Sequence, residues 1–235
     1  MRLQELKSQT LYYQDQLNPI LWQDQQLKHE IRYRLLLIAR HFINFLKISE
    51  LYLKDIILSG SNAAYGYSEY SDIDLHLLVY FPKNRIELKE LYDAKKNQYN
   101  TEYNITIKNI NVELYVQNAQ DPFYSAGIYS ILNNHWIKRP QHQYPNITAK
   151  EIRNKAKTYS SKINFALRSN DLELAKKVLD ELKQLRRAGL AKGGEESLEN
   201  LTFKFLRNRG QINKLRKYIN KLTSDSLSLG EQNEN

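Results

Sequence analysis

Residues 60–79 read GSNAAYGYSEYSDIDLHLLV, and this stretch decides the fold. It begins with the pair Gly60-Ser61, which directly follows an apolar run at residues 56–58. A glycine turn of this kind offers backbone N–H groups and a hydroxyl, which are suitable donors for a phosphate chain. The pair is therefore a candidate for binding the phosphates of a nucleotide.

Two aspartates, Asp72 and Asp74, follow after a spacer and open a second apolar run. Alternate residues of a strand point to the same face, so we expect both carboxylates on one side and Ile73 and Leu75 in the core. Two neighbouring carboxylates repel each other unless a cation lies between them. Oxygen ligands at this spacing suit Mg²⁺ or Mn²⁺, so the pattern predicts a site for a metal–nucleotide complex.

This segment resembles the nucleotidyltransferase superfamily that includes DNA polymerase β, in which Gly-Ser is followed by a similar spacer and two alternate aspartates. Minimal nucleotidyltransferases share GSxAxG followed by SDIDL, although Gly66 falls one residue later here than in that pattern. The strings SDIDLH at 71–76 and VELYVQ at 112–117 are also similar to predicted nucleotidyltransferases encoded by tailed bacteriophages. That wider similarity extends over most of the chain.

The superfamily takes a third carboxylate from a later strand, and Glu113 is the candidate in this sequence. Residues 111–116 alternate between polar and apolar side chains, which leaves Glu113 on the face opposite the core. A lone Glu in a strand often faces solvent without a function, so that interpretation stays open. The upstream motif favours the metal site.

The resemblance implies transfer of a nucleoside monophosphate from an NTP, with ATP the expected nucleotide, to an acceptor hydroxyl with release of pyrophosphate. Asp72, Asp74 and Glu113 are the expected catalytic residues and ligands of Mg²⁺ (or Mn²⁺). Two such ions would stabilise the attacking and leaving oxygens. Gly60 and Ser61 are expected to bind the nucleotide through its β- and γ-phosphates.

Turn residues and hydrophobic spacing predict an α/β (α+β) fold class, with an all-α helical C-terminal domain after the first domain. The resemblance implies that the first domain is a nucleotidyltransferase core with a mixed sheet. The expected catalytic domain with N-terminal helices covers 1–140, the helical domain 148–222 and a polar tail 223–235. In the core we expect helices at 1–17, 24–47 and 84–98, strands at 52–59, 73–81, 103–108 and 112–117, and a hairpin at 127–139. In the helical domain we expect helices at 148–168, 171–188, 195–208 and 210–222, with Gly189 and Gly193-Gly194 ending the second.

Composition limits the kinds of site and the location that we expect for this protein. The chain has 235 residues and no cysteine, which excludes disulfides and thiolate metal sites. It shows no signal-peptide pattern and no apolar run long enough to span a membrane, so we expect a cytoplasmic protein, in the host cytoplasm if phage-encoded.

The net charge of the chain is +9, and residues 148–235 hold 19 Lys/Arg and 11 Asp/Glu, a net of +8. This basic third could attract an RNA or DNA acceptor or the triphosphate, or it could be a solvated helical surface.

Three functions therefore stay open, because the motif does not contact the acceptor. The leading hypothesis is transfer to an RNA end, with the basic C-terminal helices as the RNA contact. The second is transfer of AMP to a protein or small-molecule hydroxyl, and the third is a catalytically silent nucleotide- or RNA-binding module. Candidate triphosphate contacts in the helical domain are Arg186, Arg187, Lys204 and Arg207.

Overall fold

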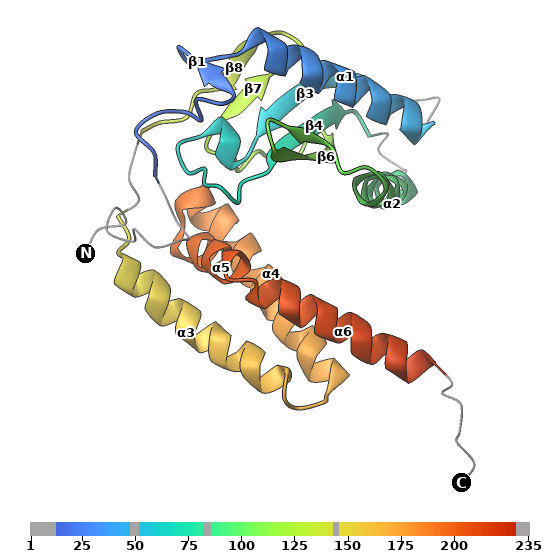
Figure 1. Cartoon of the computed structure of the whole chain (residues 1–235), viewed down its shortest axis with the longest axis vertical. Helices are drawn as coiled ribbons and strands as arrows, with labels where there is room; N and C mark the ends of the chain where they lie inside the picture. The colour runs from blue at the N-terminus through green and yellow to red at the C-terminus, as the bar shows by residue number, and fades with distance from the viewer. Residues whose placement is uncertain (1–12, 48–51, 82–85, 143–145, 229–235) are drawn as a thin grey trace. The chain divides into compact units, whose positions relative to one another are not determined.

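The computed structural model describes residues 13–47, 52–81, 86–142 and 146–228 (Figure 1). The chain divides into two compact units, one made of residues 12–144 and the other of the chain from residue 145 onward. The described part of the first unit combines a mixed sheet with helices, whereas the described part of the second is helical.

The first unit is built on a six-stranded sheet in the order β5-β6-β4-β3-β7-β8. Strands β4 and β6 are parallel and the other neighbouring pairs are antiparallel, which confirms the expected mixed sheet. The strands are β3 (Leu53–Ser59), β4 (Ile73–Val79), β5 (Thr106–Ile107), β6 (Ile110–Asn118), β7 (Ile128–Ser130) and β8 (His135–Lys138).

Two helices, α1 (His29–Leu46) and α2 (Ile86–Glu102), pack against one face of this sheet (Figure 1). Their apolar residues recur at helical spacing and share one core with the alternate strand residues Ile73 and Leu75. The opposite face of the sheet contributes only a small buried cluster of Ile57, Leu78 and Ile128. The side chains that alternate with the core residues are therefore directed away from α1 and α2.

The helix expected at 24–47 begins later, because residues 22–27 form a hairpin of β1 (Trp22–Gln23) and β2 (Gln26–Leu27). Asp24 and Gln25 both have positive φ, at 48° and 60°, as a two-residue hairpin turn requires. Trp22 and Leu27 are buried, and this burial outweighs the helical pattern. Residues 13–17, expected to end a first helix, are not helical, and residues 1–12 lie outside the described part of the chain.

The other boundaries in the first unit shift by a few residues. The helix expected to end at 98 continues to Glu102, which shortens the next strand to β5, and β4 ends two residues early at Val79. Lys108 and Asn109 form the tight turn before β6, with φ of 49° and 66°. The hairpin expected at 127–139 is confirmed as β7 and β8, with Asn134 at a positive φ of 57° in its turn.

The second unit consists of α3 (Ala149–Ala166), α4 (Leu172–Gly193), α5 (Leu198–Asn208) and α6 (Gln211–Leu227), which share one hydrophobic core. Thr148 and Glu151 form a capping box at the start of α3, and the Asp171 side chain accepts from the Leu174 N–H at the start of α4. Gly210, with a φ of 70°, separates α5 from α6 as expected. The last helix continues to Leu227 rather than ending at 222.

Gly189 does not end a helix as expected, because α4 runs through it to Gly193. A Cβ at position 189 would lie 2.6 Å from Ser197 Oγ and 2.9 Å from the Asn200 backbone nitrogen. The glycine therefore permits the start of α5 to pack closely on α4. Of the helices that the structure describes, none combines the length and the apolar character needed to cross a bilayer.

Candidate active site

The turn after β3 places Gly60 directly against the Asp74 carboxylate. Gly60 has φ of 72° and ψ of −163°, a backbone conformation that is essentially restricted to glycine. A Cβ at this position would lie 1.8 Å from Asp74 Oδ2. The motif therefore needs glycine for two reasons, backbone conformation and contact with the carboxylate. The Gly60 N–H, expected to bind a phosphate, donates to Ser125 Oγ at 2.8 Å.

Asp74 and Glu113 lie opposite each other on adjacent parallel strands. Asp74 of β4 is the register partner of Glu113 of β6, and on its other side it faces Ser59 of β3. Parallel neighbours in a sheet are about 4.8 Å apart, and in-register residues point to the same face. Both side chains are half-buried and lie on the face opposite α1 and α2. The structure thus brings two of the three expected carboxylates together.

Asp72 immediately precedes β4 and is also half-buried. Asn62, which is fully buried, holds this segment: its side-chain amide donates to the Asp72 carbonyl at 2.9 Å and to the Ser71 carbonyl at 3.3 Å. The Asn62 Oδ1 accepts from the side chain of Asn18 at 2.8 Å. Asn62 therefore couples the turn after β3 to the start of β4, and it was not among the residues predicted from the sequence.

The Ser61 hydroxyl donates to Ser71 Oγ at 2.9 Å, and Ser71 Oγ also accepts from the Ser68 N–H at 2.9 Å. Ser61 is thereby tied to the loop that leads into Asp72. The segment before β7 approaches from the other side, because a Cβ on Gly127 would lie 1.8 Å from the Ala63 carbonyl oxygen. The role of Gly127 at this turn was not visible in the sequence, since Gly127 lies more than sixty residues after Gly60.

A short polar network surrounds Glu113. The Tyr115 hydroxyl donates to the Glu113 carboxylate, and the Tyr115 ring stacks on His76 with ring centroids 4.7 Å apart. His76 Nδ1 lies 3.0 Å from Gln117 Oε1. Burial lowers the pKa of His76 to about 4, so the imidazole is neutral at pH 7. His76 therefore adds no positive charge beside the carboxylates.

The donor chemistry of the three acids suits a hard divalent cation, because all three provide carboxylate oxygens. The geometry fits less completely. Across the ranges that the structure describes, no group of three or more His, Asp or Glu side chains converges closely enough to hold a metal ion. Asp74 and Glu113 are paired by the strand register, while the Glu113 carboxylate is engaged by Tyr115. Metal binding would require that hydrogen bond to be shared or exchanged.

The basic residues suggested as triphosphate contacts lie on α4 and α5 of the second unit. The Arg186 guanidinium lies over the Phe203 ring at 5.1 Å, and the Lys204 ammonium is 3.7 Å from Glu195. These two cations therefore have structural partners inside the helical unit.

Comparisons with known proteins add little to this geometry. The chain matches no protein-family model. It matches no curated protein either. It is similar to a solved structure, the STING-associated CdnE c-di-GMP synthase from Capnocytophaga granulosa, with 13% identity over 85% of this chain and 83% of that chain. The TM-score is 0.25, which is too low to carry an argument, so the functional assignment depends on the residues of this chain.

Proposed function

We propose that the protein is a metal-dependent nucleotidyltransferase that moves a nucleoside monophosphate from an NTP to an acceptor hydroxyl and releases pyrophosphate. The observation that carries the proposal is that three features lie side by side at one point of the sheet. Asp74 lies opposite Glu113 on a parallel neighbour, and the Gly60 backbone lies against the Asp74 carboxylate. A structural glycine turn needs no carboxylate beside it, whereas a nucleotide site needs both.

Each residue has a separate role in this proposal. Asp72, Asp74 and Glu113 would hold Mg²⁺ or Mn²⁺, which would stabilise charge on the transferring phosphoryl group. Ser61 would exchange its hydrogen bond to Ser71 for one to a phosphate oxygen. Glu113, half-buried and hydrogen-bonded by Tyr115, would accept the proton of the acceptor hydroxyl. ATP is the expected nucleotide.

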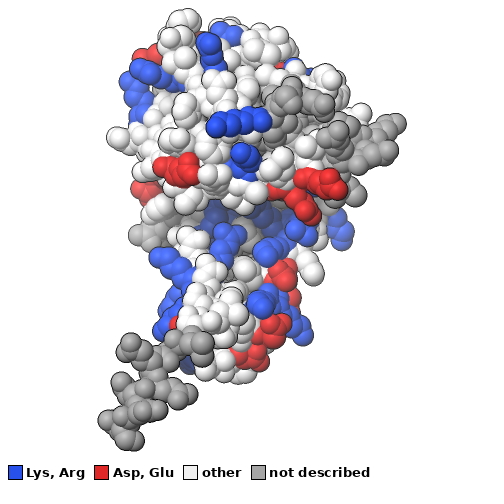
Figure 2. Space-filling view, turned by 90° about the vertical axis from the view of Figure 1, so that its right-hand side faces the viewer, with Lys and Arg blue, Asp and Glu red and all other residues white. Residues whose placement is uncertain are grey.

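The acceptor we propose is an RNA end. The support is electrostatic, because residues 148–235 carry a net charge of +8 while the rest of the chain is nearly neutral. In Figure 2, Lys and Arg side chains appear along both edges of the helical unit, and acidic side chains gather mainly along one of them. A polyanionic acceptor is favoured by such a surface over a neutral small molecule.

A catalytically silent nucleotide-binding module is the second candidate. It is favoured by the hydrogen bond between Tyr115 and Glu113 and by the lack of a converged three-carboxylate group among the described residues. The two candidates differ in a measurable way. A silent module binds nucleotide without consuming it, whereas a transferase releases pyrophosphate.

The test is incubation of the full chain with Mg²⁺ and each α-labelled NTP in turn, in the presence of pooled RNA and pooled protein. We expect label to enter acid-insoluble material that ribonuclease releases and protease does not. Label that protease releases and ribonuclease does not would show that the acceptor is a protein and not RNA. Nucleotide binding without label transfer or pyrophosphate release would favour the silent module.

A further inference from the structure

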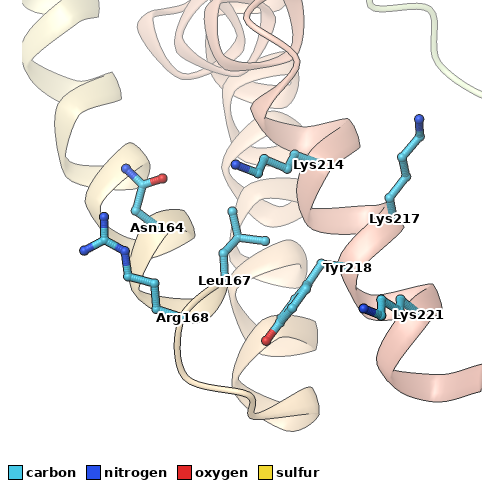
Figure 3. Close-up of a pocket in the computed structure, with 7 residues that line it drawn as sticks. All are labelled: Asn164, Leu167, Arg168, Lys214, Lys217, Tyr218 and Lys221. Atoms are coloured by element: carbon cyan, nitrogen blue, oxygen red, sulfur yellow. The ribbon is translucent and has the colours of Figure 1, made fainter. Parts of the chain in front are cut away.

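A pocket of about 420 Å³ lies inside the helical unit, between the end of α3 and the middle of α6 (Figure 3). It is distinct from the carboxylate site, which belongs to the other unit. The lining residues are Asn164, Leu167, Arg168, Lys214, Lys217, Tyr218 and Lys221. Four of these seven side chains are cations, and no acid is among them.

The four cations of this basic pocket, Arg168, Lys214, Lys217 and Lys221, have no ion-pair partner among the described residues. Nine other lysines lie in the described part of this unit, and five of them form ion pairs: Lys155 with Glu199, Lys162 with Glu181, Lys176 with Glu173, Lys183 with Asp180, and Lys204 with Glu195. The other four, Lys150, Lys157, Lys177 and Lys192, form no ion pair among the described residues, but none of them lines the pocket. The pocket is therefore a place where cations are gathered without their counter-charges.

The three lysines of α6 also share one face of the helix, since they are spaced by three and four residues. Like charges at this spacing repel each other, so the arrangement costs free energy unless an anion offsets it. Figure 3 shows the Lys214 side chain extending toward α3 and the Lys221 side chain directed toward Tyr218. An anion in the pocket would be within reach of groups from both helices.

Two aromatic side chains accompany this charge. Tyr218 lines the pocket and is half-buried against the core of the unit. Phe165 directly follows the pocket-lining Asn164 on α3, and it keeps 66% of its surface exposed. Covering an exposed phenylalanine ring with another ring removes apolar surface from water, which is favourable. Base stacking on aromatic side chains is a general means of holding single strands.

We propose that the basic pocket binds consecutive phosphodiester groups of single-stranded nucleic acid, with Tyr218 and Phe165 stacking on the flanking bases. The four cations neutralise the backbone, and the aromatic rings accept any base because every base has a π-face. The role of this site, to retain an acceptor strand, rests on the proposed function. Binding itself does not, since it requires neither nucleotide nor metal.

The test is fluorescence anisotropy of a labelled single-stranded oligouridylate of about twelve nucleotides, titrated with the full chain over a range of salt concentrations. The variant combines Lys214→Gln, Lys217→Gln and Lys221→Gln. Its control combines Lys176→Gln, Lys177→Gln and Lys183→Gln on α4, which removes the same charge from exposed positions of the same unit. Both are measured without NTP or metal, and again with Asp74→Asn added. Failure of binding is thus separable from failure of transfer.

We expect the pocket variant to bind at least about tenfold more weakly than wild type, with a salt slope shallower by about 2, since each single-strand contact adds about 0.7. The α4 control should change affinity by less than about threefold. Equal losses of affinity in the two variants would mean that the strand is bound by the net positive charge of the unit and not by the pocket. Unchanged binding in the pocket variant would show that the pocket is not the binding site.

The aromatic part has its own test. Phe165→Ala should weaken oligouridylate binding at least about fivefold while leaving thermal stability unchanged, because the side chain is exposed. Unchanged affinity would overturn the stacking role. Inorganic phosphate and UMP serve as competitors, and we expect neither to displace the strand at equal concentration. Displacement by UMP would instead assign the pocket to a free nucleotide.

Discussion

The carboxylate site of the sheet and the basic pocket of the helices both gather like charges, but they do so by different means. At the carboxylate site, the strand register sets Asp74 opposite Glu113, and backbone hydrogen bonds hold the two positions together. In the basic pocket, the end of α3 and the middle of α6 bring four cations together with no acid among the lining side chains. The first arrangement can be inferred from local alternation in the sequence, and the second becomes visible only in three dimensions.

The strongest test of the comparison removes one charge from the sheet. Asp74→Asn should lower nucleotidyl transfer by about 10³-fold, because it removes a preorganised charge at the reacting phosphate. Thermal stability should stay the same or rise slightly, since the repulsion between Asp74 and Glu113 is relieved. Asp180→Asn, an exposed position on α4, is the control and should leave transfer unchanged. Wild-type turnover by Asp74→Asn at saturating Mg²⁺ would contradict the assignment.

Glu113→Gln should lower transfer by about 10²-fold, because it keeps the size and hydrogen bonding of the side chain but removes its charge. Nucleotide affinity should change little, which separates a role in chemistry from a role in binding. The measurement is turnover at saturating nucleotide together with equilibrium nucleotide binding. Glu90→Gln on an exposed turn of α2 is the matched control. A variant with weakened nucleotide binding and normal turnover would place Glu113 outside the reacting group.

Two glycines with similar φ angles, one in each unit, give a matched pair. Gly60 and Gly210 have φ of 72° and 70°, but a Cβ on Gly210 meets nothing within 4 Å. Gly210→Ala should therefore cost about 1–2 kcal/mol of unfolding free energy from the backbone alone. Gly60→Ala should cost more and reduce transfer at least about tenfold, because its Cβ displaces the Asp74 carboxylate. Chemical denaturation and turnover measure both effects, and equal outcomes at the two positions would contradict the proposed contact.

The smallest effect compares a paired with an unpaired cation of the helical unit. Lys155 lies beside Glu199 and lowers its pKa, so this pair stabilises the fold at neutral pH and loses that contribution as pH falls through the acidic range of the carboxyl. Lys155→Gln should cost at most about 1 kcal/mol at pH 7 and converge with wild type in acid. Lys217→Gln should cost nothing or stabilise slightly. Denaturant titrations at several pH values measure both losses of unfolding free energy. A larger loss for Lys217→Gln than for Lys155→Gln at pH 7 would contradict this prediction.

Much of the carboxylate site could be predicted because its decisive features are local. Gly60 and the alternating Asp72 and Asp74 lie within fifteen residues, and strand alternation alone predicts which side chains share a face. The roles of Asn62, Ser125 and Tyr115 could not be predicted in the same way. Asn62 and Ser125 act through contacts with residues distant in sequence. Tyr115 is close to Glu113 in sequence, but the sequence does not show which hydrogen-bond partner its hydroxyl takes.

The helix boundaries show a similar limit. Asp24 and Gln25 fit a helical pattern, but burial of Trp22 against Trp136, more than a hundred residues away, favours a hairpin. Gly189 has the composition of a helix end and serves instead as a close contact between α4 and α5. Neither packing partner can be identified from the neighbouring sequence, so tertiary contacts overrode the local pattern.

The most direct test of the central claim uses two parallel reactions of the full chain with Mg²⁺ and the RNA pool, one with α-labelled and one with γ-labelled ATP. The account predicts that the α-label enters RNA while the γ-label is released in pyrophosphate, and that Asp74→Asn lowers both by about 10³-fold. Transfer of the γ-label to the acceptor, or equal incorporation of the α-label by Asp74→Asn, would contradict it.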